Sequence, residues 1–384
     1  MTIKLCSKNL SQYLIDTGLF SEQDLESMSI EFQGNSNWKI VLISDCQLVV
    51  KQDIHHHNSD TTNKIDNEWQ LYRFFNSCPD LSYIISLYPE ISYFNKTNSI
   101  MIYKYPKDYI DLESYYNNQK IFPIKIAELV GFTLAALHRD TLNSHNCCDF
   151  MNQTVEAKFR YQFPYPVYLE DRLDPETFFN SPPETYKFIN LYQGHEWLRT
   201  AVKKLVLEHS HYCLTHNKPL LNNILIPWHW EELLSKSNKS EQSFAKMINW
   251  EDCSWGDPAF DLGTAIAGYF LLWLNSLIVH PDIELNKSLQ LATIPLEIIQ
   301  PSVVALTRVY LSSFPKVLED CPEFTKRVIQ FSGLALIYKI IAMIQSFSGF
   351  NNQSICLLQL AKSLICQPEE SFKSVFGIKE YELL

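Results

Sequence analysis

The string Asn249–Leu262 (NWEDCSWGDPAFDL) constrains the fold more than any other part of the sequence. It leads directly into Leu262–Val279, a run without a single charged residue. A helix that crosses a membrane needs about 20 apolar residues, and this run follows an acidic motif without a break. We therefore interpret it as a fully buried helix of a large lobe, and we interpret the apolar run Val328–Phe347, which carries Lys339, in the same way.

The same string resembles the signature of the aminoglycoside/choline phosphotransferase family, whose members have a protein-kinase-like fold. The matching positions are consecutive and in register: Gly256, Asp257, Pro258, Ala259, Phe260, Asp261 and Leu262. The resemblance implies a two-lobed α+β protein with a small antiparallel-sheet N-lobe and a large helical C-lobe. It also implies that Asp257 and Asp261 are structural supports and that Asp261 braces the catalytic loop, which makes Asp261 a candidate residue of the catalytic site.

The remaining patterns fit this order of elements. The 384 residues, 46% of them apolar and 20% charged, suffice for two folded lobes. Apolar spacing of the helical type predicts helices in residues 8–28, 64–76, 123–138, 191–209 and from 262 onward. Short apolar runs between turns predict strands within residues 40–51, 81–105, 221–227 and 245–250.

The boundary between the lobes is expected near Tyr105–Pro106. We therefore assign the N-lobe to residues 1–106 and the C-lobe to residues 107–384. The polar stretch 231–242 is expected to be a surface loop. The family's substrate specificity is set by an insert that corresponds here to residues 139–212, and this insert carries no motif that identifies a substrate.

A second motif, Leu214–Ile226 (LTHNKPLLNNILI), resembles the family's catalytic loop, H-x-D-x-x-x-x-N. His216 and Asn223 are correctly spaced. The resemblance implies that the Asp accepts the proton of the substrate hydroxyl, and that the Asn holds a metal ion beside the nucleotide. Lys218 occupies the Asp position, and an ammonium has three donors and no acceptor. Lys218 and His216 are thus the catalytic candidates of a loop that lacks its proton acceptor.

The metal-binding motif also departs from the family pattern. The family's magnesium-binding aspartate, the first residue of D-W-E, is Asn249 in this chain. A neutral amide is a poor substitute for a carboxylate in holding Mg²⁺. Glu251 and Asp252 are close enough in sequence to replace it with shifted geometry. The candidate metal residues are therefore Asn223, Asn249 and Glu251, and we expect Mg²⁺ to bind far worse than in the family.

The N-lobe keeps more of the family pattern. Lys51, at the end of LVVK, resembles the strand lysine that contacts the α- and β-phosphates, and Glu68 in the next helix is placed to pair with it. The turn that contains Gly34 and Asn37 resembles the loop that covers the nucleotide. Tyr103 lies in the strand that would contact the adenine. The resemblance thus implies a site for ATP or another nucleotide.

The formal net charge of −11 argues against partners such as nucleic acid or an anionic membrane surface. The ten cysteines form no C-x-x-C pair, and no signal peptide is evident, so we expect a cytoplasmic protein with reduced thiols. Around the phosphate site, the substitutions at positions 218 and 249 add three positive charges relative to the family pattern. We therefore expect that a nucleotide can bind without Mg²⁺, with Lys218 and Lys51 replacing the metal ion.

These substitutions leave three functions open. The first is a pseudokinase, a nucleotide-binding or structural subunit that acts through a partner protein. Kinase-like chains resembling this family work beside a separate lyase in peptide natural-product pathways, which makes a lyase one possible partner. The second is an active phosphotransferase that acts on a small-molecule or peptide hydroxyl with a relocated base and metal ligand. The third is a nucleotidyl transferase that binds ATP in the inverted orientation.

Overall fold

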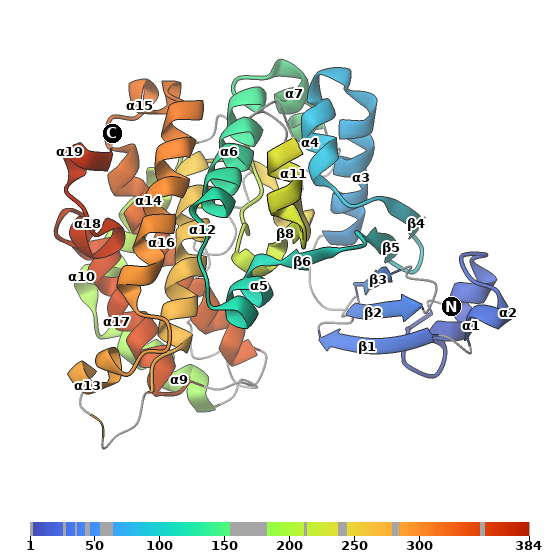
Figure 1. Ribbon diagram of the computed structural model, residues 1–384, viewed down its shortest axis with the longest axis horizontal. Coiled ribbons are helices and arrows are strands. Elements are labelled where there is room, and N and C mark those ends of the chain that lie inside the picture. The colour runs from blue at the N-terminus through green and yellow to red at the C-terminus, as the bar shows by residue number, and fades with distance from the viewer. Residues whose placement is uncertain are drawn as a thin grey trace. The chain divides into compact units, whose positions relative to one another are not determined.

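The computed structural model describes residues 3–25, 28–34, 37–42, 47–53, 64–153, 183–210, 213–236, 244–278, 283, 285–345 and 350–383. The chain forms two compact units, and each unit is assembled from two segments of sequence. Unit 1 comprises Met1–Ile110 and Leu225–Asp252. Unit 2 comprises Asp111–Ile224 and Cys253–Leu384. Figure 1 shows that unit 1 holds the larger sheet and that unit 2 consists mainly of helices.

Unit 1 is built on a five-stranded antiparallel sheet in the order β1-β2-β3-β5-β4. Its strands are β1 (Met28–Gly34), β2 (Asn37–Leu42), β3 (Gln47–Gln52), β4 (Ile91–Asn95) and β5 (Ile100–Tyr105). The strands expected within residues 40–51 are confirmed by β2 and β3. Because β3 pairs with the central strand β5, Lys51 lies opposite Met101 in the interior of the sheet.

The side chains of β3 alternate between the two faces of the sheet, and both faces are buried along this strand. Leu48 and Val50 pack in one cluster with residues of α1 (Leu10–Asp16), and Val49 packs in a different cluster. Successive side chains of a strand point to opposite faces. Lys51 therefore lies on the same face as Val49.

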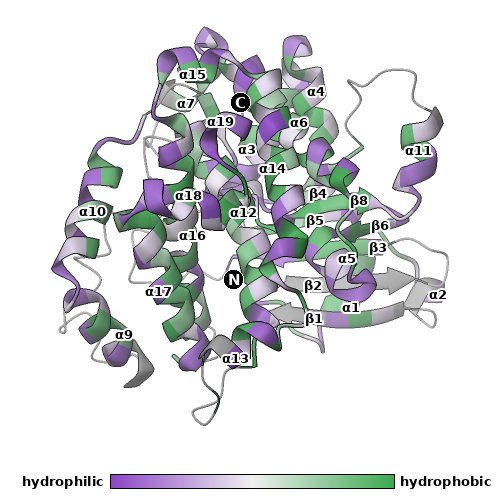
Figure 2. Ribbon diagram, turned by 60° about the vertical axis from the view of Figure 1, so that its left-hand side comes forward, coloured by the Kyte–Doolittle hydropathy of each residue, from purple (hydrophilic) through white to green (hydrophobic). Residues whose placement is uncertain are grey.

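The other elements of unit 1 include a second sheet with the strand order β6-β8-β9. These elements are α2 (Glu22–Leu25), α3 (Lys64–Ser77), η1 (Pro79–Leu81), α4 (Ser82–Leu87), β6 (Tyr109–Asp111), β8 (Ile224–Pro227), α11 (Trp230–Lys236), β9 (Lys246–Met247) and η4 (Trp250–Asp252). The helix expected over residues 64–76 is confirmed by α3. The ribbon of β5 and β8 is largely green in Figure 2, which marks their residues as hydrophobic.

Two stretches of unit 1 differ from the sequence-based expectation. Residues 81–105 were expected to form only strands, but Ser82–Leu87 is a helix. Its apolar residues Ile84 and Leu87 are buried and stand three positions apart, so they lie on one side of a helix. The stretch 231–242 was expected to be a surface loop, but Trp230–Lys236 is a helix, because Glu, Leu and Lys are strong helix formers. Residues 237–242 lie outside the described residues.

Unit 2 is a layered helical assembly with one short antiparallel pair, β7 (Cys213–Thr215) and β10 (Ser254–Gly256). Its helices are α5 (Leu112–Gln119), α6 (Ile124–Thr141), α7 (His145–Gln153), α9 (Pro183–Gln193), α10 (Glu196–Leu207), η3 (Leu221–Asn223), α12 (Pro258–Asn275), α13 (Leu285–Gln290), α14 (Leu296–Ser313), α15 (Lys316–Asp320), α16 (Phe324–Gln345), α17 (Asn352–Cys366), α18 (Pro368–Phe376) and α19 (Glu380–Leu383). The α+β class and the two-lobed arrangement that the motifs predicted are confirmed.

The two long apolar helices of unit 2 form its core. Almost every residue of α12 is buried, and α12 packs against α16, which also packs against α17. Among the described residues, one helix, Phe324–Ile344, is long and apolar enough to cross a membrane, and 61% of the window that qualifies is buried inside the protein. This burial agrees with the interpretation of both apolar runs as core helices.

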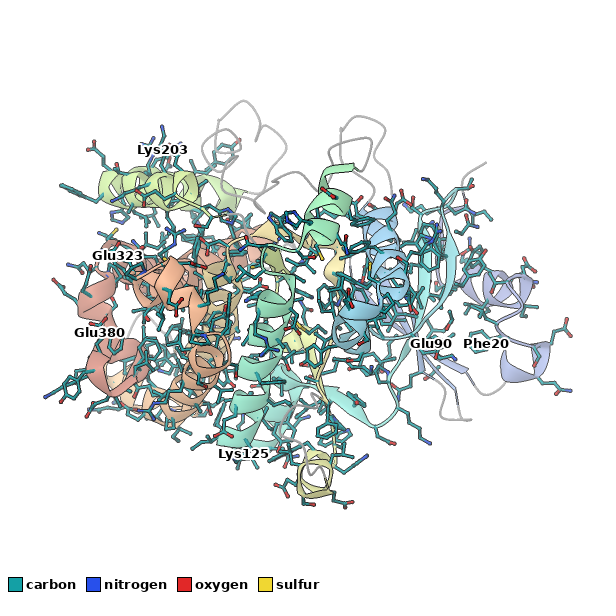
Figure 3. All side chains as sticks on the ribbon, turned by 90° about the horizontal axis from the view of Figure 1, so that it is seen from above. Phe20, Glu90, Lys125, Lys203, Glu323 and Glu380 are labelled. Carbon is teal, nitrogen blue, oxygen red and sulfur yellow. The ribbon has the colours of Figure 1, made fainter. Side chains whose placement is uncertain are left out.

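Close packing of α6 on α14 depends on Gly131. A β-carbon at this position would lie 2.2 Å from the carbonyl oxygen of Leu306, far inside van der Waals contact. We expect Gly131→Ala to separate the two helices and to lower the free energy of unfolding by roughly 1–3 kcal/mol. Urea denaturation measures the loss. Lys125→Ala on the exposed side of α6, labelled in Figure 3, is the control and should change stability by less than about 0.5 kcal/mol.

Candidate functional site

Lys51, the candidate phosphate-binding lysine of unit 1, is almost completely buried, with 4% of its surface exposed. Its ammonium contacts two carboxylates, because Nζ lies 3.0 Å from Oε2 of Glu68 and 3.1 Å from Oε2 of Glu251. Nζ also lies 5.6 Å from the centroid of the Tyr103 ring. The structure thus contains the pair of Lys51 and Glu68 that their order in the sequence predicted. The contact with Glu251 was not predicted.

The turn η4 brings Glu251 toward Lys51. Glu68 accepts a hydrogen bond from the backbone N–H of Trp250 at 3.3 Å. The indole of Trp250 stacks on Tyr88 with the ring centroids 4.4 Å apart, and its Nε1 donates to the carbonyl oxygen of Met247 at 2.9 Å. Trp250 is buried and held at both its backbone and its ring, and this places the backbone of the next residue, Glu251, near Lys51.

The three charges in this cluster do not cancel. Burial opposes the charge of Lys51, but Glu251 and Glu68 outweigh burial and raise its pKa above the ordinary value. Burial raises the pKa of Glu68 to about 7, with a further contribution from Glu251, whereas Lys51 acts in the opposite direction. One ammonium cannot neutralise two carboxylates, so the cluster of Lys51, Glu68 and Glu251 has a negative charge in excess when all three groups are ionised.

The candidate metal residues of unit 1 lie in and beside the turn η4. Asn249 has a left-handed backbone, with φ of 67°, a conformation that Asn tolerates better than most residues. Glu251 is paired with Lys51, and Oδ1 of Asp252 lies 2.7 Å from Nζ of Lys64. Both carboxylates that could replace the missing aspartate are therefore engaged by lysines. Within the described residues, no group of three or more His, Cys, Asp or Glu side chains could hold a metal ion.

The other nucleotide candidates of unit 1 lie on the same sheet. Gly34 and Asn37 are partners at the end of the β1–β2 pair, where the register shifts after Phe32. Residues 35 and 36 of the expected nucleotide-covering turn lie outside the described residues. Tyr103 is buried in β5, and burial raises the pKa of its phenol. Its contact with an adenine stays a prediction.

In unit 2, the carboxylate of Asp261 binds the backbone of the loop in Leu214–Ile226 that resembles the family's catalytic loop. Its carboxylate is completely buried and accepts hydrogen bonds from the backbone N–H groups of His216 at 2.7 Å and Asn217 at 2.6 Å. Nε2 of His138 lies 3.1 Å from Oδ2 of the same carboxylate, and Nδ1 of His138 lies 2.8 Å from the hydroxyl of Tyr310. Asp261 is thus placed to brace the loop, as the resemblance implied.

Lys218, the residue that the motif aligns with the missing proton acceptor, lies in a loop whose backbone is held by its neighbours. Asn217 has a left-handed backbone, with φ of 65°, and its side-chain amide donates to Oγ of Ser254 at 2.7 Å. The N–H of Lys218 donates to Nδ1 of His216 at 3.3 Å, and Nδ2 of Asn223 donates to the carbonyl oxygen of Lys218 at 2.8 Å. His216 and Asn223 therefore both hold the backbone of residue 218, whose own side chain is half-buried.

One supporting residue of unit 2, Arg327, was missed by the sequence analysis. Asp257 caps α12 by accepting from the N–H of Ala259 at 3.0 Å, and it also binds the guanidinium of Arg327 at 2.5 Å. Arg327 lies in α16, far from any motif, so no local signal could identify it. His138 of α6 is a further support of the loop, because it is completely buried and lies against the carboxylate of Asp261.

Comparison of structures shows which known proteins have this fold. The chain is similar to the ethanolamine kinase of Plasmodium vivax, with 13% identity and a TM-score of 0.53 over 97% of this chain and 92% of that one. It is similar to a choline/ethanolamine kinase family protein from Mesorhizobium loti, with 15% identity and a TM-score of 0.50 over 91% of each chain. It is also similar to an amicoumacin kinase in complex with AMP-PNP, Ca²⁺ and Ami, with 11% identity and a TM-score of 0.52 over 99% of this chain and 100% of that one.

At these low identities the comparisons establish the fold. The chain has the kinase-like fold of the choline/ethanolamine kinases, and the resemblance found in the motifs is confirmed at that level. No family model matches the sequence. None of the curated proteins matches it either.

Proposed function

Proceeding from this fold, we propose that the chain is a nucleotide-binding pseudokinase that acts through a partner protein. One observation carries the proposal. The loop of unit 2 is braced by Asp261 as the family resemblance implies, yet residue 218 presents an ammonium instead of a carboxylate. General-base catalysis needs a group that accepts the proton of the attacking hydroxyl, and a charged lysine has no acceptor.

Nucleotide binding is supported by the Lys51 cluster. A buried lysine on a sheet strand, paired with a glutamate of the following helix, is the arrangement with which kinase-like proteins hold the α- and β-phosphates. The similar amicoumacin kinase has AMP-PNP bound in its structure. We propose ATP or another nucleotide as the ligand, with Gly34, Asn37 and Tyr103 as further binding residues of unit 1, and with poor binding of Mg²⁺.

The partner and the location are proposed on the sequence. A pseudokinase needs a second protein on which to act, and a lyase or another enzyme of the same pathway is the proposed partner. The cytoplasm is the proposed location, and the acidic net charge of −11 argues against a nucleic-acid partner.

A thermal-shift titration tests nucleotide binding. We expect ATP to raise the melting temperature of the wild type in the presence of EDTA, and we expect no shift for Lys51→Ala because the ammonium that holds the phosphates is gone. A γ-phosphate transfer assay on small alcohols and peptides should stay far below the roughly 1–100 s⁻¹ that is typical of kinases. Transfer at that rate, or a melting shift that persists in Lys51→Ala, would contradict the proposal.

The second candidate, an active phosphotransferase, is favoured by the position of Glu251. This carboxylate lies beside Lys51, where a relocated metal ligand would be expected. An active enzyme of this kind would lose transfer on Glu251→Gln and also on Asn223→Ala. A wild type without measurable transfer would exclude this candidate and leave the pseudokinase.

A further inference from the structure

Glu68 and Glu251 contact the same ammonium but differ in their access to solvent. The side chain of Glu68 is 5% exposed, and that of Glu251 is 20% exposed. Glu68 is also held by the N–H of Trp250 through its second oxygen. Glu68 is therefore the more deeply buried partner of Lys51, with contacts at both of its oxygens, and Glu251 is the partner that a ligand arriving from solvent meets first.

We propose that Glu251 is a specificity-determining residue that competes with the phosphate groups of the ligand for Lys51. The inference rests on the proposed binding of nucleotide at Lys51 and adds how that binding is controlled. In the unliganded protein the Glu251 carboxylate occupies the outer side of the ammonium. A phosphate group binds when it displaces this carboxylate, and Glu68 stays in place.

The negative charge of Glu251, and not the number of donors on Lys51, explains the competition. An ammonium has three N–H donors, and an oxygen of Glu68 and an oxygen of Glu251 lie within hydrogen-bonding distance of its nitrogen. A phosphate oxygen that bonds on the outer side meets the negative charge of Glu251 at the same place. Two negative groups that both contact the ammonium of Lys51 lie close to each other, and such like charges repel strongly where water is partly excluded. The ligand must therefore carry enough negative charge to outcompete a carboxylate that is already in place.

The consequence is a selection among ligands by their phosphate charge. A polyphosphate chain can offer several oxygens to Lys51 and displace one carboxylate, whereas a ligand without phosphate gains nothing there. Glu251→Gln removes the competing charge and leaves a side chain of nearly the same shape. We expect this variant to bind polyphosphate ligands about tenfold more tightly than the wild type, a gain of about 1.4 kcal/mol.

Isothermal titration calorimetry in EDTA tests the inference, with ATP and inorganic tripolyphosphate as the two probes. Tripolyphosphate separates the phosphate contribution from that of the nucleoside. Glu90→Gln is the matched control, because Glu90 forms an exposed ion pair with Lys104, at 2.7 Å, in the same unit. Figure 3 labels Glu90. Lys51→Ala reports whether binding depends on the lysine at all.

The outcomes separate the inference from the proposed function. Tighter binding of both probes by Glu251→Gln, with Glu90→Gln equal to the wild type, supports the inference, as does binding by Glu251→Gln where the wild type binds too weakly to measure. If Glu251→Gln binds the probes no more tightly than the wild type, while Lys51→Ala still fails to bind them, the inference is overturned. The proposed nucleotide site at Lys51 is then retained. Failure of every variant to bind either probe overturns both.

Discussion

Asp261→Ala is expected to lower the free energy of unfolding by about 3–5 kcal/mol, the usual cost of removing one partner from a buried ionic network. The substitution leaves the N–H groups of His216 and Asn217 without their acceptor, and it removes the carboxylate beside His138. Each buried donor left without a partner costs about 1–3 kcal/mol. Urea denaturation followed by tryptophan fluorescence measures the loss.

The control for this prediction is Asp320→Ala, which removes an exposed aspartate from α15 in the same unit. Its effect should stay within about 0.5 kcal/mol. Asp261→Asn keeps one carbonyl acceptor and should fall between the alanine variant and the wild type. A loss below about 1 kcal/mol for Asp261→Ala would mean that Asp261 does not brace the loop.

Lys51→Met is expected to destabilise unit 1 by about 3–5 kcal/mol at pH 8, because it leaves Glu68 buried without its cation. The loss should be smaller at pH 5. The pKa of Glu68 is already raised to about 7 by burial, and removal of Lys51 raises it further. A carboxyl whose pKa is higher in the folded state than in the unfolded state stabilises the fold when it is protonated. This contribution to the free energy of unfolding is complete below the unfolded-state pKa, about 4.5, and it is lost as the pH rises through the folded-state pKa.

Chemical denaturation at pH 5 and pH 8 tests whether Lys51→Met loses less stability at the lower pH. Lys104→Met, which removes a half-exposed surface lysine from the same sheet, is the matched control and should show little loss at either pH. The double variant Lys51→Met/Glu68→Leu removes both buried charges and should recover most of the stability. A loss for Lys51→Met that is equal at both pH values would show that packing, and not the charge of Glu68, causes it.

The motifs predicted the fold because they belong to its most constrained backbone positions. Asp257 begins α12 and Asp261 fixes the loop, so their spacing depends on one helical turn and can be read from the sequence. The pair of Lys51 and Glu68 could be predicted from order alone, since a strand followed by a helix brings them together.

The second partner of Lys51 could not be predicted in the same way. Whether Glu251 or Asp252 turns toward Lys51 depends on η4 and on the left-handed backbone of Asn249, and neither has a clear sequence signal. The same turn sends Asp252 to Lys64. The motifs alone therefore gave three added positive charges around the phosphate site. That count left out the carboxylate of Glu251, which pairs with Lys51.

The discontinuous course of unit 1 limits how it can be produced by itself. A fragment that stops at residue 106 would end before β8 and β9 and would lack Leu225 and Ile248, which complete the cluster around Val49. It would also lack Glu251, so Lys51 would have a single carboxylate partner. An isolated unit intended for ligand titrations therefore has to join residues 1–110 to residues 225–252 through a designed linker.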